Sequence, residues 1–469
     1  MSRNKTFLKN TVIIFLGKLL TQFMSLLLIP LYTHFLGTSD YGYIDLVQTY
    51  VLLLVPLGCL RIDTAVFRFL IDNRKDDSKK AKIIFNSFLV TLLGCIIIVV
   101  CGFILNYILG IKYFSDIVLN LIILTISSLL LQVLRGDGNN KKYSISSIIV
   151  GFLTLVLNVI FIVFLNQGAI SILYSSNIAN LIGIIYIVFT IRKIISLNKK
   201  NYDKKLIKDM AKYSLPMIPD YLSGWVINVS DRTIISAFLG NAMNGIYSVS
   251  CKFSNILNSI YNIYNITWQE NVVLHFNDED RDSYFTELFN DSLSIFSSLG
   301  LGVLIFLPVL FNIIIGPKYA DSYNYIPILL YANIWRVIVG LTMGFYVANK
   351  KTKEVAITTF ISAVINIVIN LILINYIGIY AACVSTLISY FIMAIYRYND
   401  CKKFINIKLD IKMIISYTIM YIISSVCFYS NSFITYLINI LIMSILMILL
   451  NKRMIIKILN KIKRKKLKI

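Results

Sequence analysis

Long apolar stretches separated by short polar loops run along the whole chain. There are fourteen, each of 19 to 27 residues, and a helix needs about 20 residues to cross the hydrocarbon core of a bilayer. They cover residues 10–31, 43–67, 83–109, 116–134, 145–166, 169–191, 214–239, 246–268, 293–315, 325–348, 354–374, 377–396, 411–430 and 432–450. The pattern predicts an all-α polytopic membrane protein with 14 transmembrane helices. A composition of 58% hydrophobic and 14% charged residues agrees with it.

The basic residues fall almost entirely on one side of these stretches. Of 45 Lys and Arg residues, 37 lie in every second loop counted from the N-terminus or, for Lys412, at the edge of such a loop, and only Lys112 and Lys318 lie in the others. Lys and Arg collect in cytoplasmic loops because their transfer across the membrane during insertion is costly. We therefore expect a protein of the cytoplasmic membrane with both termini in the cytoplasm.

The same charge distribution and the motif content exclude several function classes. The net charge of +22 is spread over alternate loops, so it serves topology and we expect no nucleic-acid partner. No GxxxxGK[ST] phosphate loop occurs, which argues against ATP-driven pumping. The two histidines lie far apart and the seven cysteines form no CxxC pair, so we expect no metal site and no cofactor.

An internal repeat predicts how the helices are grouped. The segments FLGTSDYG (35–42) and FLGNAMNG (238–245) share the pattern FLGxxxxG and lie 203 residues apart. A second pair, Asn158 with Gly168 and Asn370 with Gly378, repeats at offsets of 212 and 210 residues. Six predicted helices separate the copies, and an even number preserves orientation in the membrane. We therefore expect two six-helix bundles related as a parallel pseudo-repeat.

The polar stretches set the expected boundaries of these bundles. We expect an N-terminal bundle over 1–195, a basic cytoplasmic linker over 196–212 and a C-terminal bundle over 213–400. Residues 401–469 would add two further transmembrane helices and a basic cytoplasmic tail. That tail either serves topology or binds anionic lipid.

Six basic residues do not fit the loops, because they lie within predicted helices or at their edges. They are Lys18, Arg61, Arg68, Arg232, Lys252 and Arg336. A Lys or Arg at the centre of a membrane helix costs about 2.5–3.5 kcal/mol. Contact with lipid is therefore excluded, and these side chains must line a hydrated cavity or pair with acids.

Polar residues recur at helical spacing beside these cations. They are Lys252, Asn255, Ser259 and Asn262 on 246–268, Trp225, Asn228 and Arg232 on 214–239, and Lys18 and Gln22 on 10–31. Each set lies on one helical face, which favours a cationic central cavity suited to an anionic group such as a pyrophosphate. The candidate substrate-binding residues are Lys18, Arg61, Arg232, Lys252, Arg336, Asn228, Asn255 and Asn262.

The alternative is ion pairing inside the bundles. Asp63, Asp72, Asp220 and Asp231 are available as partners, and Arg68 is expected at the inner membrane interface rather than in a cavity. Asp231 and Arg232 are neighbours in sequence, so their side chains point about 100° apart and pair poorly. Asp63, Asp220 and Asp231 are also the candidates for coupling transport to an ion.

Part of the sequence resembles a known family. The segment SLPMIPDYLSGWVINVSDRTIISAFLGNAMNGIYSVSCKFSNIL (214–257) resembles the seventh and eighth helices of Wzx-type polysaccharide-repeat flippases. These belong to the multidrug/oligosaccharidyl-lipid/polysaccharide exporter (MOP) superfamily, with MATE drug exporters and lipid II flippases. Residues 56–70 and 370–390 resemble further parts of the family. Thr267–Glu270 departs from it, because relatives often have AW followed by proline there.

The resemblance implies a MATE-like fold and a function. The substrate would be an undecaprenyl-pyrophosphate-linked oligosaccharide repeat unit, moved across the cytoplasmic membrane by alternating access. Membrane lipids, a polysaccharide polymerase and glycosyltransferases would be its partners. The alternatives are a lipid II flippase, a cation-coupled drug exporter, which would need a carboxylate where the first helix has Lys18, and a glycan polymerase or glycosyltransferase. We expect a transporter and no enzyme.

Overall fold

The computed structural model describes residues 3–194, 198–349, 351–430, 432–452 and 455–456, without the side chains of 3–16 and of a few other positions. Within these ranges the chain is helical and contains no strand. The helices are α1 (Arg3–Phe35), α2 (Thr38–Gly58), α3 (Ile62–Asp72), α4 (Asp77–Leu109), α5 (Phe114–Gly136), α6 (Asn140–Val159), η1 (Ile160–Phe164), η2 (Gly168–Ile170), α7 (Ser171–Ile191), η3 (Lys199–Asn201), α8 (Lys204–Ser214), η4 (Leu215–Met217), α9 (Ile218–Leu239), α10 (Asn241–His275), α11 (Arg281–Ile314), η5 (Pro317–Tyr325), α12 (Ile326–Ala348), α13 (Thr352–Ile377), α14 (Tyr380–Cys401), α15 (Ile411–Phe428) and α16 (Phe433–Leu450).

Eleven helical segments of the described chain are long and apolar enough to cross a membrane. They coincide with eleven of the 14 predicted spans and confirm an all-α polytopic membrane protein. The other three predicted spans, 10–31, 214–239 and 246–268, fall on the continuous helices α1, α9 and α10. Helix α10 is the most polar of the three, because it carries seven asparagines together with Lys252 and Glu270. These three helices are the ones on which the sequence placed its polar stripes.

The predicted span 43–67 is not one helix, which corrects the sequence prediction. Helix α2 ends at Gly58, and α3 begins at Ile62. Between them Leu60 and Arg61 have φ values of 50° and 56°, in the left-handed region that side chains with a Cβ rarely occupy. The Arg61 N–H donates to Pro56 O at 2.9 Å, so the last turn of α2 closes on itself before α3 starts.

The chain forms two compact units, Met1–Val229 and Ser230–Ile469. The boundary lies inside α9, and the predicted linker 196–212 belongs to the first unit. Its helix α8 packs against α3 and α4. The side chain of Asn86 on α4 also fixes this segment, because it donates to Asn201 O at 2.8 Å and accepts from Asp203 N at 3.0 Å. The two units are described separately below.

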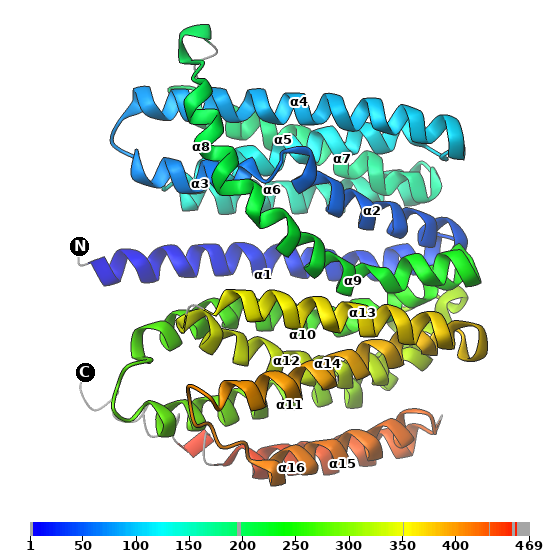
Figure 1. Cartoon of the computed structure of the whole chain (residues 1–469). Helices are drawn as coiled ribbons and strands as arrows, with labels where there is room; N and C mark the ends of the chain where they lie inside the picture. Colours follow the sequence, from blue (N-terminus) through cyan, green and yellow to red (C-terminus); the bar gives the residue numbers. More distant parts are fainter. Residues whose placement is uncertain (1–2, 195–197, 350, 431, 453–454, 457–469) are drawn as a thin grey trace, which may run out of the picture. The chain divides into compact units, whose positions relative to one another are not determined.

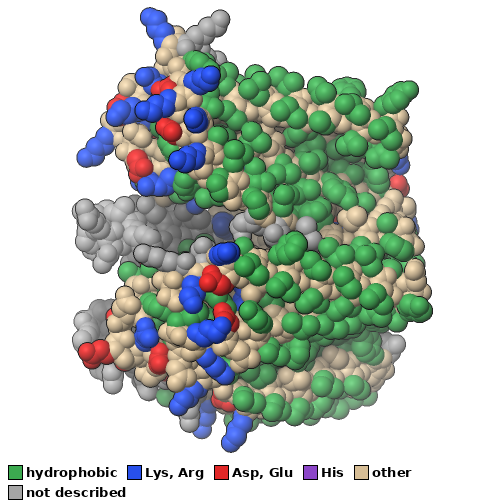
Figure 2. All heavy atoms as spheres, in the orientation of Figure 1, with side chains coloured by type: hydrophobic (Ala, Val, Ile, Leu, Met, Phe, Trp, Pro, Cys, Tyr) green, Lys and Arg blue, Asp and Glu red, His purple; other side chains and the backbone are tan. Residues whose placement is uncertain are grey.

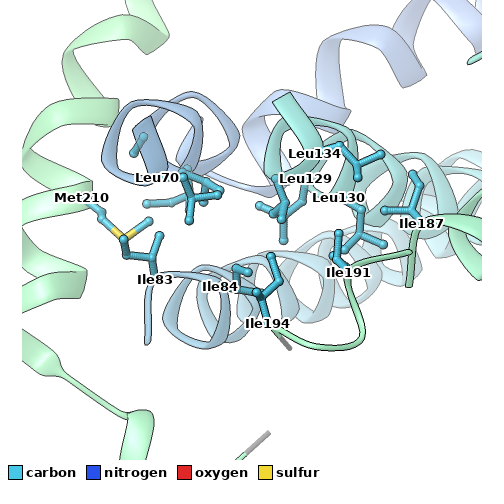
Figure 3. Packing of buried hydrophobic residues seen from close by; sticks show 14 residues of the cluster. Leu70, Ile83, Ile84, Leu129, Leu130, Leu134, Ile187, Ile191, Ile194 and Met210 are labelled. Atoms are coloured by element: carbon cyan, nitrogen blue, oxygen red, sulfur yellow. The ribbon is translucent and has the colours of Figure 1, made fainter. Parts of the chain in front are cut away.

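In the first unit α5 is the central helix, in contact with α2, α3, α4, α6 and α7. One buried core joins α3, α4, α5, α7 and α8 through Leu70, Ile84, Leu130, Ile187 and Met210, all of which Figure 3 labels. Helix α1 packs on α6, and α6 packs on α7. The fold thus buries one stripe of each helix and leaves other apolar side chains, such as those along α4, exposed to the surroundings.

In the second unit α12 takes the corresponding central place, in contact with α10, α11, α13 and α14 (Figure 1). The C-terminal pair α15 and α16 packs on α11. A buried polar network fixes the pair there, because Asn451, just after α16, donates to Ser298 Oγ at 2.9 Å and to Tyr417 OH at 3.0 Å. In each unit the charged side chains gather at one end of the helices, and apolar side chains cover their length (Figure 2).

The two copies of the repeat predicted from sequence occupy corresponding turns between helices, although Gly37 has a φ of −74° and Gly240 a φ of 90°. Gly37 and Gly240 are the N-cap residues of α2 and α10, so each FLGxxxxG segment forms the turn between two helices. Gly168 and Gly378 both have positive φ, 69° and 57°, and stand before α7 and α14. A glycine occupies this conformation without steric cost, which explains why both copies use one.

Candidate functional site

Asp231 on α9 is the most completely enclosed of the predicted site residues. Its side chain is only 3% exposed. Its carboxylate accepts hydrogen bonds from Tyr247 OH on α10 at 3.0 Å, Asn370 Nδ2 on α13 at 2.8 Å and Thr386 Oγ1 on α14 at 2.8 Å. Asn366 on α13 adds a fourth donor at 3.2 Å when its amide nitrogen faces the carboxylate. Four helices of the second unit therefore meet at one carboxylate.

These four donors are neutral side chains, which gives the Asp231 site its particular electrostatics. A carboxylate that leaves water loses several kcal/mol of hydration unless hydrogen bonds or a counter-ion replace it. Hydrogen bonds from Tyr247, Asn370 and Thr386 replace the hydration that the carboxylate has lost. Because these donors carry no positive charge, they leave the site polar and anionic. No group of three or more His, Cys, Asp or Glu side chains suited to a metal ion occurs among the described residues.

The other two coupling candidates differ from Asp231. Asp63, in the first turn of α3, is buried at 4% exposure, and Cys59 Sγ donates to its carboxylate at 3.6 Å. It lies beside the break between α2 and α3. The side chain of Asp220 lies outside the described residues, and so does that of Asn228.

Among the predicted cations of the first unit, Lys18 and Arg61 lie in different surroundings. Lys18 on α1 is exposed. Arg61 is partly buried in the break between α2 and α3, with its guanidinium 5.1 Å from the ring centre of Tyr221. Its Nε is buried without a hydrogen-bond partner. Neither cation forms an ion pair with a carboxylate that the structure describes.

The second unit holds the other predicted cations on three helices. Lys252 on α10 and Arg336 on α12 are partly buried and form no ion pair within the described part of the chain. The guanidinium of Arg336 lies 5.7 Å from the ring centre of Tyr390 on α14. Arg232 on α9 is also partly buried. Of the predicted polar stripe, Asn255 is partly buried and Asn262 is exposed.

The sixth cation, Arg68, forms the ion pair that the alternative interpretation expected. It pairs with Asp72 one helical turn later, and both side chains are about half exposed, at 49% and 58%. Asp72 therefore neutralises the charge of Arg68 at an exposed position of α3. The contrast with Lys252 and Arg336 separates an interfacial ion pair from cations inside helices that have no carboxylate partner among the described residues.

Arg397 is a buried cation that sequence reasoning missed, because counting loop charges assigned it to the cytoplasm. It is 2% exposed near the end of α14. Its guanidinium donates to Thr358 Oγ1 at 2.9 Å, Val355 O at 3.0 Å and Thr359 Oγ1 at 2.8 Å on α13. These neutral acceptors fix α14 to α13. No motif distinguishes Arg397 from its exposed neighbours in the sequence.

Comparison with known proteins identifies the family. The sequence model of the family described as "Polysaccharide biosynthesis protein" matches residues 7–268, more than half of the chain. The chain belongs to this family. It is a flippase family of the MOP superfamily, as the resemblance predicted. The chain is also 24% identical over 409 residues to an uncharacterized membrane protein of Methanocaldococcus jannaschii, covering 78% of each chain.

Solved structures confirm the MATE-like fold of this family member. The lipid II flippase MurJ in its inward closed conformation superposes with a TM-score of 0.68 at 16% identity, covering 96% of this chain and 100% of that one. MATE in complex with MaL6 superposes with a TM-score of 0.61 at 13% identity, over 85% and 95% of the chains. A MOP superfamily transporter from Pyrococcus furiosus gives 0.53 at 13% identity over the same shares.

The corner where the sequence departs from its family serves packing. Trp268, which lies at this corner, is 2% exposed. Its Nε1–H donates to Leu341 O at 2.9 Å, and its ring centre lies 5.7 Å from that of Phe345 in an edge-on arrangement. Tyr261 is 5% exposed in the same aromatic core. The rings of Tyr261 and Trp268 pack against α11 and α12.

Proposed function

We propose that this polysaccharide biosynthesis protein is a flippase for undecaprenyl-pyrophosphate-linked oligosaccharide repeat units. It moves them from the cytoplasmic to the outer leaflet by alternating access, with both of its termini in the cytoplasm. Family membership supports a flippase. The repeat units come from glycosyltransferases and go to a polymerase, which makes such enzymes, together with membrane lipids, its expected partners.

The choice of substrate rests on one observation: four of the predicted membrane cations have no carboxylate partner among the described residues. Lys18, Arg61, Lys252 and Arg336 have no carboxylate partner among the described residues, and Arg61 also has a buried donor without an acceptor. The partly buried cations Arg61, Lys252 and Arg336 attract a polyanion more strongly than fully solvated ones, because less water screens the charges. These cations and Arg232 therefore hold the pyrophosphate, and Asn228, Asn255 and Asn262 hydrogen-bond the sugars.

Asp231 is the group that couples transport to an ion. A carboxylate inside the membrane marks ion or proton pathways in transporters because its burial is otherwise too costly. Its four donors come from α10, α13 and α14, so a change of charge at Asp231 acts on three other helices at once. Asp63 and Asp220 are weaker candidates: Asp63 contacts Cys59 within its own segment.

Chemical analysis of cells that lack this chain tests the substrate. We expect lipid-linked repeat units to accumulate on the cytoplasmic leaflet and surface polysaccharide to disappear, and re-expression to reverse both. The rival is a lipid II flippase, which has the same fold. Rescue of cells depleted of their lipid II flippase, with unchanged surface polysaccharide in the deletion strain, would overturn the proposal.

A further inference from the structure

Helix α8 displays lysine side chains on one of its faces. Lys204, Lys205, Lys208 and Lys212 fall within an arc of about 100°, because successive residues of a helix turn by about 100°. All four side chains are exposed, and none of them forms an ion pair among the residues that the structure describes. The one acid of the helix, Asp209, lies beside this arc. These four lysines form the lysine face of α8, which keeps a net positive charge.

The opposite face of α8 holds the helix in place. Met210 is 1% exposed and belongs to the buried core that contains Ile83 and Ile84 of α4. Leu206 packs against the same core. At the start of the helix the side chain of Asp203 accepts a hydrogen bond from Leu206 N at 3.0 Å, which caps the first turn. The lysine face is therefore presented by a helix that is fixed to the first unit.

The neighbours of α8 place it at the depth of the lipid headgroups. It lies at the beginning of the predicted span 83–109 on α4, where Asn86 donates to Asn201 O and accepts from Asp203 N just before α8. At its other end α8 leads through η4 into α9, which carries the predicted span 214–239. Figure 1 shows α8 crossing the other helices of the first unit instead of running along them, and Figure 2 shows Lys and Arg gathered at this end of the unit. Because the lysine face is opposite to the packed face, it points away from the protein at the level of the lipid phosphates.

Two features of α8 favour lipid contact over topology alone as the reason for its charge. Charge that only fixed the topology could lie anywhere in the loop, whereas these lysines lie on a helix held against α3 and α4 at headgroup depth. Tyr202, just before α8, and Tyr213, in its last turn, are 56% and 38% exposed. Tyrosine is enriched at the membrane–water interface because its ring is apolar and its hydroxyl group is polar.

We propose that the lysine face of α8 binds the phosphate groups of anionic phospholipids in the cytoplasmic leaflet. Charge complementarity supports this occupant, because basic residues beside a membrane attract anionic headgroups. The choice of leaflet rests on the proposed orientation of the chain, whereas the binding itself does not depend on the transported substrate. Bound lipid anchors α8 at the membrane surface, and with it the start of α9, the helix that carries Asp231.

Photo-crosslinking tests the proposal on the full-length purified chain. The protein is placed in nanodiscs of phosphatidylcholine with a small fraction of phosphatidylglycerol that carries a diazirine in its headgroup, and mass spectrometry after pepsin digestion maps the labelled residues. We expect α8 to be labelled in the wild type and at least about tenfold less in the variant Lys204→Gln/Lys205→Gln/Lys208→Gln/Lys212→Gln. Each basic residue beside an anionic surface corresponds to roughly a fivefold factor in affinity, so the loss of four exceeds this threshold. A phosphatidylcholine probe with the same diazirine should label α8 weakly and equally in both proteins.

Two controls keep the outcome decisive. The variant Lys353→Gln/Lys402→Gln/Lys408→Gln/Lys412→Gln removes the same number of exposed lysines from the second unit and should be labelled at α8 like the wild type. If the lysine-face variant does not fold, wild-type protein in 1 M NaCl replaces it, because the Debye length falls to about 3 Å and the labelling of α8 should drop. Equal labelling of α8 by phosphatidylglycerol in wild type and lysine-face variant, or equal labelling of wild-type α8 by the two probes, overturns the proposal. Equal labelling together with the loss of a bound acidic protein from the variant would assign the lysine face to a protein partner instead.

Discussion

The amide of Asn370 on α13 donates a 2.8 Å hydrogen bond to the carboxylate of Asp231 on α9, 139 residues earlier in the chain. Asn370 is itself fully buried. The bond therefore connects two helices of the second unit through a charged group that water does not reach. Because Tyr247 and Thr386 donate to the same carboxylate, its charge state affects four helices together.

Replacing Asp231 by Asn should abolish transport and also destabilise the protein. An amide has one acceptor atom and turns an NH₂ group toward donors such as Tyr247 OH, so buried donors lose their acceptor. Each such loss costs about 1–3 kcal/mol. We expect at least a tenfold loss of surface polysaccharide in cells and a lower midpoint of thermal unfolding of the purified variant.

Tyr247→Phe is the matched control for Asp231→Asn. It removes one of the donors but keeps the charge, so it should lower the free energy of unfolding by only about 1 kcal/mol and leave most of the transport. Equal transport by the two variants would show that the charge of Asp231 does not drive the transport cycle.

Removing the guanidinium of Arg397 should destabilise the second unit severely. Arg397→Ala leaves a cavity, deprives Thr358 Oγ1 and Thr359 Oγ1 of the guanidinium donor and removes one of the donors to Val355 O. We expect a loss of about 3–5 kcal/mol in the free energy of unfolding. Arg68→Ala, which breaks the exposed pair with Asp72, should cost at most about 1 kcal/mol. Thermal unfolding in detergent compares them, and equal midpoints would contradict the structural role of Arg397.

The sequence was sufficient to predict an all-α polytopic membrane protein, but not the way its helices bend and pair. Apolar length and loop charge located the transmembrane segments, because membrane insertion depends on local composition. The break at Leu60 and Arg61 was missed, since neither residue favours positive φ. The tertiary contact beside it, the Arg61 guanidinium over the ring of Tyr221, could not be read from the local sequence either.

The sequence predicted which residue types form the candidate site, but not which side chains surround them. Asp231 stood out as a carboxylate inside a span, yet its donors Tyr247, Asn370 and Thr386 come from three other helices, and helical periodicity does not reveal contacts between helices. Arg397 looked like any cytoplasmic arginine, because a loop count records position along the chain and not burial.

Gly340 on α12 should not tolerate a side chain. A Cβ at this position would lie 2.2 Å from Tyr261 OH and 2.5 Å from the same ring, which is buried. Gly340→Ala should therefore cost about 1–3 kcal/mol of unfolding free energy through overpacking. Gly302→Ala on α11 is the control, because its Cβ meets nothing within 4 Å and alanine favours a helix. Thermal unfolding should separate the two variants, and an unchanged midpoint for Gly340→Ala would contradict the packing.

The central claim is that unpaired membrane cations hold the pyrophosphate of the lipid carrier. Lys252→Ala and Arg336→Ala each remove one cation that has no carboxylate partner among the described residues. A lost charge-assisted hydrogen bond of about 1.5–3 kcal/mol corresponds to roughly a 10- to 150-fold loss. Lys252→Arg keeps the charge and should keep most of the activity.

Surface polysaccharide is therefore measured in the deletion strain that expresses Lys252→Ala, Lys252→Arg or the wild type at matched protein levels. The account predicts at least a tenfold loss for Lys252→Ala and near-normal polysaccharide for Lys252→Arg. Normal polysaccharide in cells that express Lys252→Ala at the matched protein level would contradict it.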